Sequence, residues 1–362
     1  MIPYENLKVL NTPFESRLKT KFADFLDSGW YVLGQEVKLF EEEFGRYHKE
    51  SYVVGVGNGL DALILSLKCC NFKPGDEVIV PSNTYIATIL AIIHCNLIPV
   101  LVEPDTRTYN IDPQSINAAI TSKTVAIIVV HLYGQCCEMD PILKIGKNYK
   151  LKIIEDCAQA HGATYKNKLA GTFGDFGAFS FYPTKNLGAL GDGGAVICKN
   201  ESDYKKLLQF RNYGSDKKYH NDVIGYNSRL DELQAAFLRI KLPHLDEINT
   251  HKRKLAVIYN NNLKEAFIRP VELSNFHHVY HIYNILHPER DRLRKYLLDN
   301  SIATEIHYPV APQDQVALQG YLKSYKYPIS LHIHQTTLSL PCSFAHTEEQ
   351  IHHVCKIINE FN

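Results

Sequence analysis

Lys185 is the residue whose surroundings most directly suggest chemistry. It follows an aromatic, strand-like run, FSFYP at 179–183, and precedes a glycine-rich segment at 188–194. Glycine lets backbone and ligand approach closely, and lysine forms a Schiff base with a carbonyl once its pKa is lowered. A single lysine is ordinarily a solvated surface residue, so Lys185 indicates a site only if other suitable groups accompany it.

Three other features provide such groups. The Gly-Asn-Gly turn at 57–59 lies between an apolar strand and a helix, where backbone N–H groups can bind a phosphate. Glu155 and Asp156 end the strand KLKIIED, and period-two alternation predicts opposite faces for them, one buried and the other solvated. The turn 57–59, Asp156, Gln159 and Lys185 correspond to the four parts of a pyridoxal phosphate site, which are, in this order, a phosphate cup, a pyridinium counter-ion, a ring contact and an amine.

The composition is that of a folded protein without a polyanion or membrane partner. Lys plus Arg number 39, as do Asp plus Glu, and no dense basic run suits nucleic acid. No segment is apolar and long enough for a signal peptide or a membrane span, so we expect a cytoplasmic protein. The nine cysteines have no CxxC or Cys/His metal spacing, so we expect reduced, mostly structural thiols and no metal site.

Between about residues 50 and 200, short apolar, β-branched runs alternate with helix-like segments. This pattern predicts an α/β fold with a mostly parallel sheet whose strands are covered on both faces. Functional groups of such sheets gather at the carboxyl ends of the strands. The polar residues that follow predicted strands, and are therefore expected near the site, are Asn58, Ser82, His131, Asp156 and Ser180.

At 362 residues the chain is long enough for two domains. From about 230 it becomes helical, with long amphipathic segments broken near Pro243. A strand over 277–288 and helices over 289–300 and 348–361 are predicted beyond it. We therefore expect a large domain over 1–245 and a smaller C-terminal α+β domain over 246–362.

Five segments carry a resemblance to a known family. They are GNGLDAL at 57–63, PSNTYIAT at 81–88, IIEDCAQAHGA at 153–163, GDFGAFSFYPTKNLGALGDGGA at 174–195 and GYNSRLDELQAA at 225–236. In this order they are similar to the DegT/DnrJ/EryC1/StrS sugar aminotransferases, and the resemblance covers nearly the whole chain. It implies the aspartate aminotransferase-like α/β fold of pyridoxal phosphate enzymes of fold type I, with pyridoxal 5'-phosphate as cofactor.

The resemblance also implies a role for each residue of the site. Lys185 and Asp156 are the catalytic residues: the lysine binds the cofactor aldehyde, and the aspartate stays ionised beside the ring nitrogen, whose positive charge lowers its pKa. The other implied cofactor contacts are Gly57, Asn58, Gly59 and Ser180 around the phosphate, Tyr85 and Gln159 on the ring, and Asn227, which reaches the phosphate of a neighbouring subunit. The implied sugar contacts are Tyr182, His307 and Tyr308. The protein would then be a homodimer with shared active sites.

The reaction implied is transfer of an amino group from glutamate, which leaves as 2-oxoglutarate, to a nucleotide-linked keto sugar, for the deoxyamino sugars of cell-surface polysaccharides. The turn GNGLDAL resembles enzymes that aminate C3 of a dTDP-linked 3-keto-6-deoxyhexose, whereas many C4 aminotransferases of the family have a GT-x-AL turn. Amination at C4 of a dTDP- or UDP-4-keto-6-deoxyhexose stays open, because IHYPVAPQDQ at 306–315 lacks the Pro-Leu-His that often follows Tyr-Pro in other members.

Three other classes of protein are less compatible with the sequence. A sugar dehydratase of the same fold has histidine at the position of Lys185. A nicotinamide-dependent oxidoreductase would need Gly-x-Gly-x-x-Gly, but residues 55–59 read Gly-x-Gly-x-Gly. A non-catalytic binding or regulatory protein with this fold would be supported by an added segment such as a helix-turn-helix, and none is recognisable.

Overall fold

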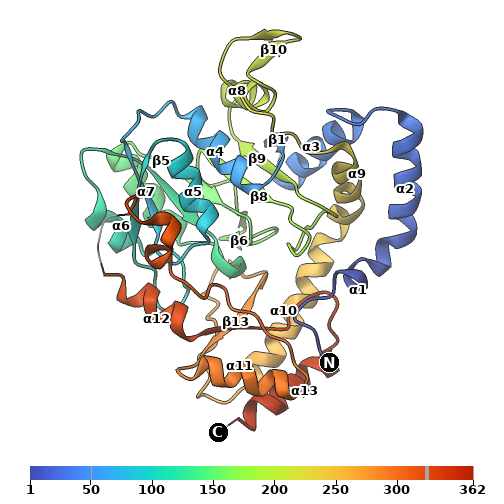
Figure 1. Cartoon of the computed structure of the whole chain (residues 1–362), viewed down its shortest axis with the longest axis vertical. Coiled ribbons are helices and arrows are strands. Elements are labelled where there is room, and N and C mark those ends of the chain that lie inside the picture. The colour runs from blue at the N-terminus through green and yellow to red at the C-terminus, as the bar shows by residue number, and fades with distance from the viewer. Residues whose placement is uncertain (50, 323–325, 362) are drawn as a thin grey trace.

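The computed structural model describes residues 1–49, 51–322 and 326–361, and a seven-stranded sheet forms its centre (Figure 1). The strand order is β1-β9-β8-β5-β4-β2-β3. β9 is antiparallel to both of its neighbours, and the pairs from β8 to β3 are parallel. The prediction of a mostly parallel sheet is therefore confirmed. The strands are β1 (Tyr52–Val56), β2 (Glu77–Pro81), β3 (Ile98–Val102), β4 (Thr124–Val130), β5 (Lys152–Asp156), β8 (Phe176–Ser180) and β9 (Gly194–Cys198).

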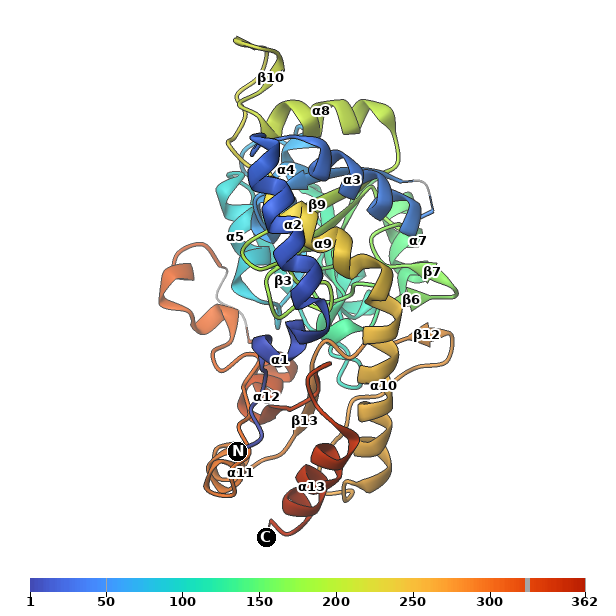
Figure 2. The same cartoon turned by 90° about the vertical axis from the view of Figure 1, so that its right-hand side faces the viewer.

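Helices cover both faces of this sheet because successive strand residues point in opposite directions. Val53 packs in a core with residues of α3 and α9, and its neighbour Val54 packs in a second core with residues of α4, α5 and α8. Figure 2 shows α2 and α3 outside the sheet, on the same side as α9. The helices of this part are α1 (Leu7–Asn11), α2 (Glu15–Ser28), α3 (Gln35–Tyr47), α4 (Gly59–Cys69), α5 (Ile86–His94), α6 (Pro113–Ala119), α7 (Met139–Tyr149), α8 (Glu201–Arg211) and α9 (Glu232–Lys241).

The C-terminal part has a core of its own. Tyr259, Tyr283, Leu293 and Ile351 are fully buried in it, on four different elements. The elements are α10 (Leu245–Asn262), β13 (Tyr283–Leu286), α11 (Arg290–Asp299), α12 (Pro328–Thr336), β14 (Thr337–Leu340) and α13 (Glu348–Asn359). The division at 245/246 coincides with the start of α10 and stays a prediction.

Short pieces complete the fold. The paired strands β10 (Ser215–Lys217) and β11 (His220–Asn221) form a hairpin that projects from the body of the chain (Figures 1 and 2). A small sheet joins β6 (Thr164–Tyr165), β7 (Lys168–Leu169) and β12 (Phe276–His277). The predicted strand over 277–288 is interrupted: His277 ends β12, residues 283–286 form β13, and between them the chain bends at Tyr280, which has a positive φ of 44°.

The break predicted near Pro243 is a single 3-10 turn, Leu242–His244, between α9 and α10. All nine cysteines are free thiols, and all but Cys70 are buried. None of the helices in the described residues combines the length and the apolar character needed to cross a membrane.

Candidate active site

The carboxyl ends of β5 and β8 and the first turns of α4 and α5 border a pocket of ≈ 610 Å³. All but two of the predicted site residues line it: Asn58, Gly59, Tyr85, Asp156, Gln159, Ser180, Tyr182, Lys185, His307 and Tyr308. Gly57 and Asn227 do not. Parallel strands thus bring together groups more than a hundred residues apart, as expected of this sheet type.

Lys185 lies in the loop that follows β8. Its backbone N–H donates to the Tyr182 carbonyl at 2.8 Å, which closes a turn. Burial lowers the pKa of Lys185 to about 8, and the charge of Asp156 opposes this shift. Its Nζ makes no hydrogen bond or ion pair with the described residues. A substantial fraction of the amine is therefore neutral near pH 8, as a nucleophile or a base requires.

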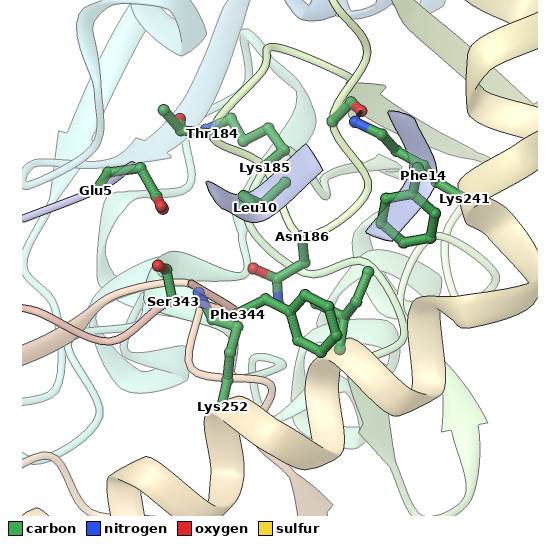
Figure 3. A pocket seen from close by; sticks show the side chains of 12 residues that line it. Glu5, Leu10, Phe14, Thr184, Lys185, Asn186, Lys241, Lys252, Ser343 and Phe344 are labelled. Atoms are coloured by element: carbon green, nitrogen blue, oxygen red, sulfur yellow. Dashed lines mark hydrogen bonds between the residues drawn. The ribbon is translucent and has the colours of Figure 1, made fainter. Parts of the chain in front are cut away.

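A low pKa alone does not distinguish Lys185, because burial also lowers the pKa of Lys241 to about 8. Lys241 Nζ donates to the Gly188 carbonyl at 2.7 Å. It borders a separate cavity of ≈ 10 Å³ behind the lysine loop, which has room for about one water (Figure 3). Of these two lysines, only Lys185 also lines the large pocket, and this placement is what distinguishes it as the reactive one.

Asp156 is a buried carboxylate, 7% exposed, without a cationic partner among the described side chains. Its Oδ2 accepts a hydrogen bond from Thr88 Oγ1 at 2.9 Å, and its Oδ1 accepts one from the Ala158 N–H at 3.1 Å. Burial raises the pKa of Asp156, opposed by these two hydrogen bonds and by the charge of Lys185. The expected lowering of this pKa thus needs a further cation, and a protonated ring nitrogen would provide one.

The helix α4 begins at Gly59, close to the end of β8. A Cβ at Gly59 would lie 2.7 Å from the Cβ of Ser180, so only glycine lets the first turn of the helix approach this serine. Asn58 is the N-cap, and its Oδ1 accepts from the Asp61 N–H at 2.8 Å. The free backbone N–H groups at this end, with the Ser180 hydroxyl, suit a phosphate.

The two predicted residues outside the pocket have other surroundings. The Gly57 N–H donates to Ser228 Oγ at 3.0 Å, so it is not directed at the pocket. Asn227 is exposed and forms a single β-bridge with Asn212, at the base of the projecting hairpin.

Aromatic residues and Gln159 form another wall of the pocket. Gln159 Oε1 accepts from the Tyr133 N–H at 2.6 Å, and its Nε2 donates to the Tyr308 hydroxyl at 2.9 Å. The rings of Tyr85 and Tyr308 lie 5.1 Å apart between centroids, tilted by 34°. Gln159 therefore links the end of β5 to the C-terminal part of the chain.

On the side predicted to hold the sugar, Tyr182 is 53% exposed at the pocket rim. His307 is more enclosed, and its Nδ1 lies 2.9 Å from Ser339 Oγ. Burial and the charge of Lys185 lower the pKa of His307 to about 4, so its imidazole is neutral near pH 7. Burial raises the pKa of Tyr308, whose hydroxyl is therefore protonated.

The sequence analysis missed residues that line the pocket, and it missed Thr88, which does not line the pocket but donates to Asp156. Thr88 is one helical turn beyond Thr84, and this i, i+4 spacing in the segment 81–88 was the available signal. His281 had no local signal, because it reaches the pocket from the C-terminal part. An apolar wall from α4 and α5 is made by Leu60, Leu63, Ile86, Ala87 and Leu90.

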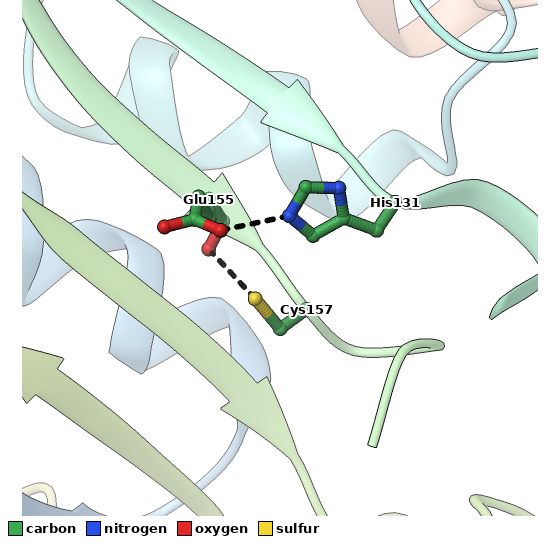
Figure 4. Close-up of side chains that lie close together, drawn as sticks. All are labelled: His131, Glu155 and Cys157. Atoms are coloured by element: carbon green, nitrogen blue, oxygen red, sulfur yellow. Dashed lines mark hydrogen bonds and ion pairs between the residues drawn. The ribbon is translucent and has the colours of Figure 1, made fainter. Parts of the chain in front are cut away.

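His131, Glu155 and Cys157 cluster beneath the pocket, with potential ligand atoms within 4.8 Å of one another (Figure 4). Glu155 accepts hydrogen bonds from His131 Nε2 at 2.9 Å and from three backbone N–H groups of the turn 171–174. His131 Nδ1 accepts from the Cys137 N–H, so the ring proton is on Nε2. Because N–H donors occupy these acceptors, the cluster fits a structural anchor and not a metal site.

The prediction that either Glu155 or Asp156 is solvated is wrong. Both are buried, at 0% and 7% exposure, because the turn 171–174 closes over Glu155 and Thr88 of α5 covers Asp156. His131 and Ser82 were also expected near the site, but neither lines the pocket, and both are buried outside it.

These features fit pyridoxal phosphate. The phosphate would lie at Ser180 and the start of α4, the ring nitrogen at Asp156, and the aldehyde at Lys185. The fit rests on a buried carboxylate that lacks a cation, an unpaired amine of low pKa, and a helix start that only glycine can bring to Ser180.

Comparisons with known proteins agree with this geometry. The model of the DegT/DnrJ/EryC1/StrS aminotransferase family matches residues 14–359. The chain is 48% identical over 362 residues to the dTDP-3-amino-3,6-dideoxy-alpha-D-galactopyranose transaminase of Aneurinibacillus thermoaerophilus, covering 100% of this chain and 99% of the relative. It is 41% identical to a Geobacillus stearothermophilus protein named pleiotropic regulatory protein, covering 95% of each.

Solved structures share the fold. A crystal structure of DesV from Streptomyces venezuelae, in complex with a ketimine intermediate, matches with a TM-score of 0.97 and 40% identity, covering 99% of this chain and 98% of that one. The expected aspartate aminotransferase-like fold is confirmed. The chain therefore belongs to the DegT/DnrJ/EryC1/StrS aminotransferase family, and it is a sugar-nucleotide aminotransferase that uses pyridoxal phosphate.

Proposed function

We propose that this enzyme transfers an amino group from glutamate to C3 of a dTDP-linked 3-keto-6-deoxyhexose, on the route to a deoxyamino sugar of a cell-surface polysaccharide. The observation that carries the proposal is the placement of Lys185 and Asp156 in one pocket with the start of α4. The choice of C3 is supported by the turn at 57–63 and by the 48% identical relative, whose name specifies a 3-amino sugar.

Pyridoxal phosphate, when bound, supplies an electron sink for a carbanion beside the reacting nitrogen. With that group bound, Lys185 Nζ, neutral above its pKa of about 8, would take the proton from the α-carbon of glutamate and hold it for return on the other side of the reacting nitrogen. The same amine moves these protons in the opposite order when the keto sugar is aminated. The two substrates react one after the other at the same lysine, and the first product leaves before the second substrate binds. We therefore expect ping-pong kinetics.

The other residues hold and orient the reacting groups. Thr88 and the Ala158 N–H fix both oxygens of Asp156, which keeps the carboxylate facing the ring nitrogen. Gly57, Asn58, Gly59 and Ser180 are assigned to the phosphate end, with Gly57 acting through its bond to Ser228. Tyr85 and Gln159 are assigned to the ring, and Tyr182, His307 and Tyr308 to the sugar.

We also propose a homodimer in which Asn227 reaches the phosphate of the partner subunit. Asn227 is exposed and outside the pocket of its own chain. Tyr219 in the hairpin beside it and Ile224 just after the hairpin are 87% and 94% exposed, and large exposed side chains of this kind suit a protein contact.

Product analysis tests the proposed reaction. The purified enzyme is offered glutamate with either a dTDP-3-keto- or a dTDP-4-keto-6-deoxyhexose, and the amino sugar is identified by NMR. We expect amination of the 3-keto sugar. Amination of the 4-keto sugar alone would identify the C4 reaction, and amination of neither would overturn the proposal.

A further inference from the structure

His281 lines the large pocket and has no part in the reaction as described above. It precedes β13 and enters the pocket from the C-terminal part of the chain. Its backbone carbonyl accepts a hydrogen bond from Lys252 Nζ, on α10, at 3.2 Å. Figure 3 shows Lys252 reaching from α10 toward the region of Asn186, next to Lys185. The backbone of His281 is thus tied to α10, and its imidazole Nδ1 lies 3.4 Å from Oδ1 of Asn186, the residue that follows Lys185.

A chain of amides determines which nitrogen of His281 carries the proton. Asn249 Nδ2 donates to the His161 carbonyl at 2.9 Å, so Asn249 Oδ1 is an acceptor. Asn186 Nδ2 donates to that oxygen at 2.7 Å and to the Val279 carbonyl at 3.2 Å. Asn186 Oδ1 therefore accepts as well, and His281 Nδ1, 3.4 Å from it, must carry the hydrogen.

His281 Nε2 consequently presents a lone pair. Burial and the charges of Lys185, Lys252, His307 and His161 lower the pKa of His281 well below its usual value, so the ring stays neutral near pH 7. Nε2 makes no hydrogen bond with the described residues, and it is not among the fully enclosed polar atoms that lack a partner. An acceptor without a partner therefore faces the pocket.

The chemistry of this atom selects its ligand. A lone pair cannot bind the carboxylates of glutamate, which are acceptors themselves, whereas a sugar hydroxyl can donate to it. A ligand without a hydroxyl at this position would leave the largely buried Nε2 without a hydrogen-bond donor. Such a ligand would therefore bind more weakly than the correct substrate. We infer that His281 is a substrate-binding residue whose Nε2 accepts a hydrogen bond from a hydroxyl group of the keto sugar. This inference rests on the proposed function.

The test separates the two half-reactions, each followed by the visible absorbance of the cofactor in single turnovers. H281A should lower kcat/KM for the keto-sugar half-reaction by about tenfold, mostly through KM, because one hydrogen bond is lost. The value of kcat/KM for the glutamate half-reaction should fall by less than about threefold, which is less than the loss of one hydrogen bond would cause. H281Q places an amide oxygen near the Nε2 position and should recover most of the loss. H353A, on the exposed side of α13, is the matched histidine control.

Calorimetric titration of the amino-sugar product gives a readout that does not depend on turnover, and H281A should weaken its binding by about tenfold. Equal loss in both half-reactions, or no loss in either, would overturn the inference. If H281A fails to fold, H281Q decides alone, and a tenfold loss for the keto sugar in H281Q would count against the proposed acceptor. A wild-type enzyme that aminates no keto sugar would instead refute the proposed function.

Discussion

Replacement of Asp156 by asparagine should affect cofactor affinity and protein stability in opposite directions. In the cofactor-free protein, the buried carboxylate has two hydrogen bonds and no ion-pair partner among the described side chains, and burial raises its pKa. Its charge is therefore unfavourable for folding until a cation binds. Asparagine can keep both contacts, since its Oδ1 accepts from the Ala158 N–H and its Nδ2 donates to the Thr88 hydroxyl.

The two effects differ in size. Loss of one partner of a buried charge pair weakens binding by about 2–5 kcal/mol, so D156N should bind pyridoxal phosphate roughly 30-fold to several thousand-fold more weakly. The free energy of unfolding of the cofactor-free protein should rise by about 0.5–2 kcal/mol, the usual range of a single stabilising substitution.

Calorimetric titration with pyridoxal phosphate and urea unfolding of the cofactor-free protein measure these quantities. D299N, in the exposed i, i+4 ion pair of α11 with Lys295, controls for the change from Asp to Asn. A dissociation constant of D156N within threefold of the wild-type value would refute the assignment of Asp156 to the ring nitrogen. A less stable cofactor-free D156N would contradict the argument from burial.

Four further predictions follow from the geometry. The rate of reductive methylation of Lys185 in the cofactor-free protein should rise through pH about 8, because the amine is neutral above its pKa; a midpoint near that of an ordinary lysine, about 10.4, would contradict this. G59A should lose stability and cofactor affinity, because its Cβ would lie 2.7 Å from Ser180 Cβ, and G59A/S180G should regain stability in urea unfolding. E155Q should be about 3–5 kcal/mol less stable than wild type, whereas exposed E289Q should not, since glutamine cannot accept from all four donors to Glu155. Mixed dimers of K185A and N227A should recover activity that neither homodimer has, since one of their two sites holds both native residues; no recovery would argue against shared sites.

Much of the fold could be predicted because local patterns and packing agree. The apolar runs that predicted covered strands become the interior of the sheet, where Val53 and Val54 join cores on opposite faces. The site followed from the same sheet, since Asp156 and Ser180 end strands, and Lys185 lies in the loop beyond.

The remaining features depend on contacts between distant segments. The sequence around His281 does not indicate that a strand beginning near 283 brings this residue to a pocket built by residues 58–185. Nor does the turn at 57–59 indicate that the Gly57 N–H is taken by Ser228, more than 150 residues later. Glu155 was expected on one face or the other, but its burial depends on the turn 171–174, which closes over it.

Lys185 is the amine expected to bind the cofactor. Borohydride reduction of the holoenzyme fixes the cofactor to its lysine, and peptide mass spectrometry then locates it. We expect modification of Lys185 alone, at about one cofactor per chain. Modification of Lys241, which has a pKa of about 8 as well but lies outside the pocket, or of no lysine, would contradict it.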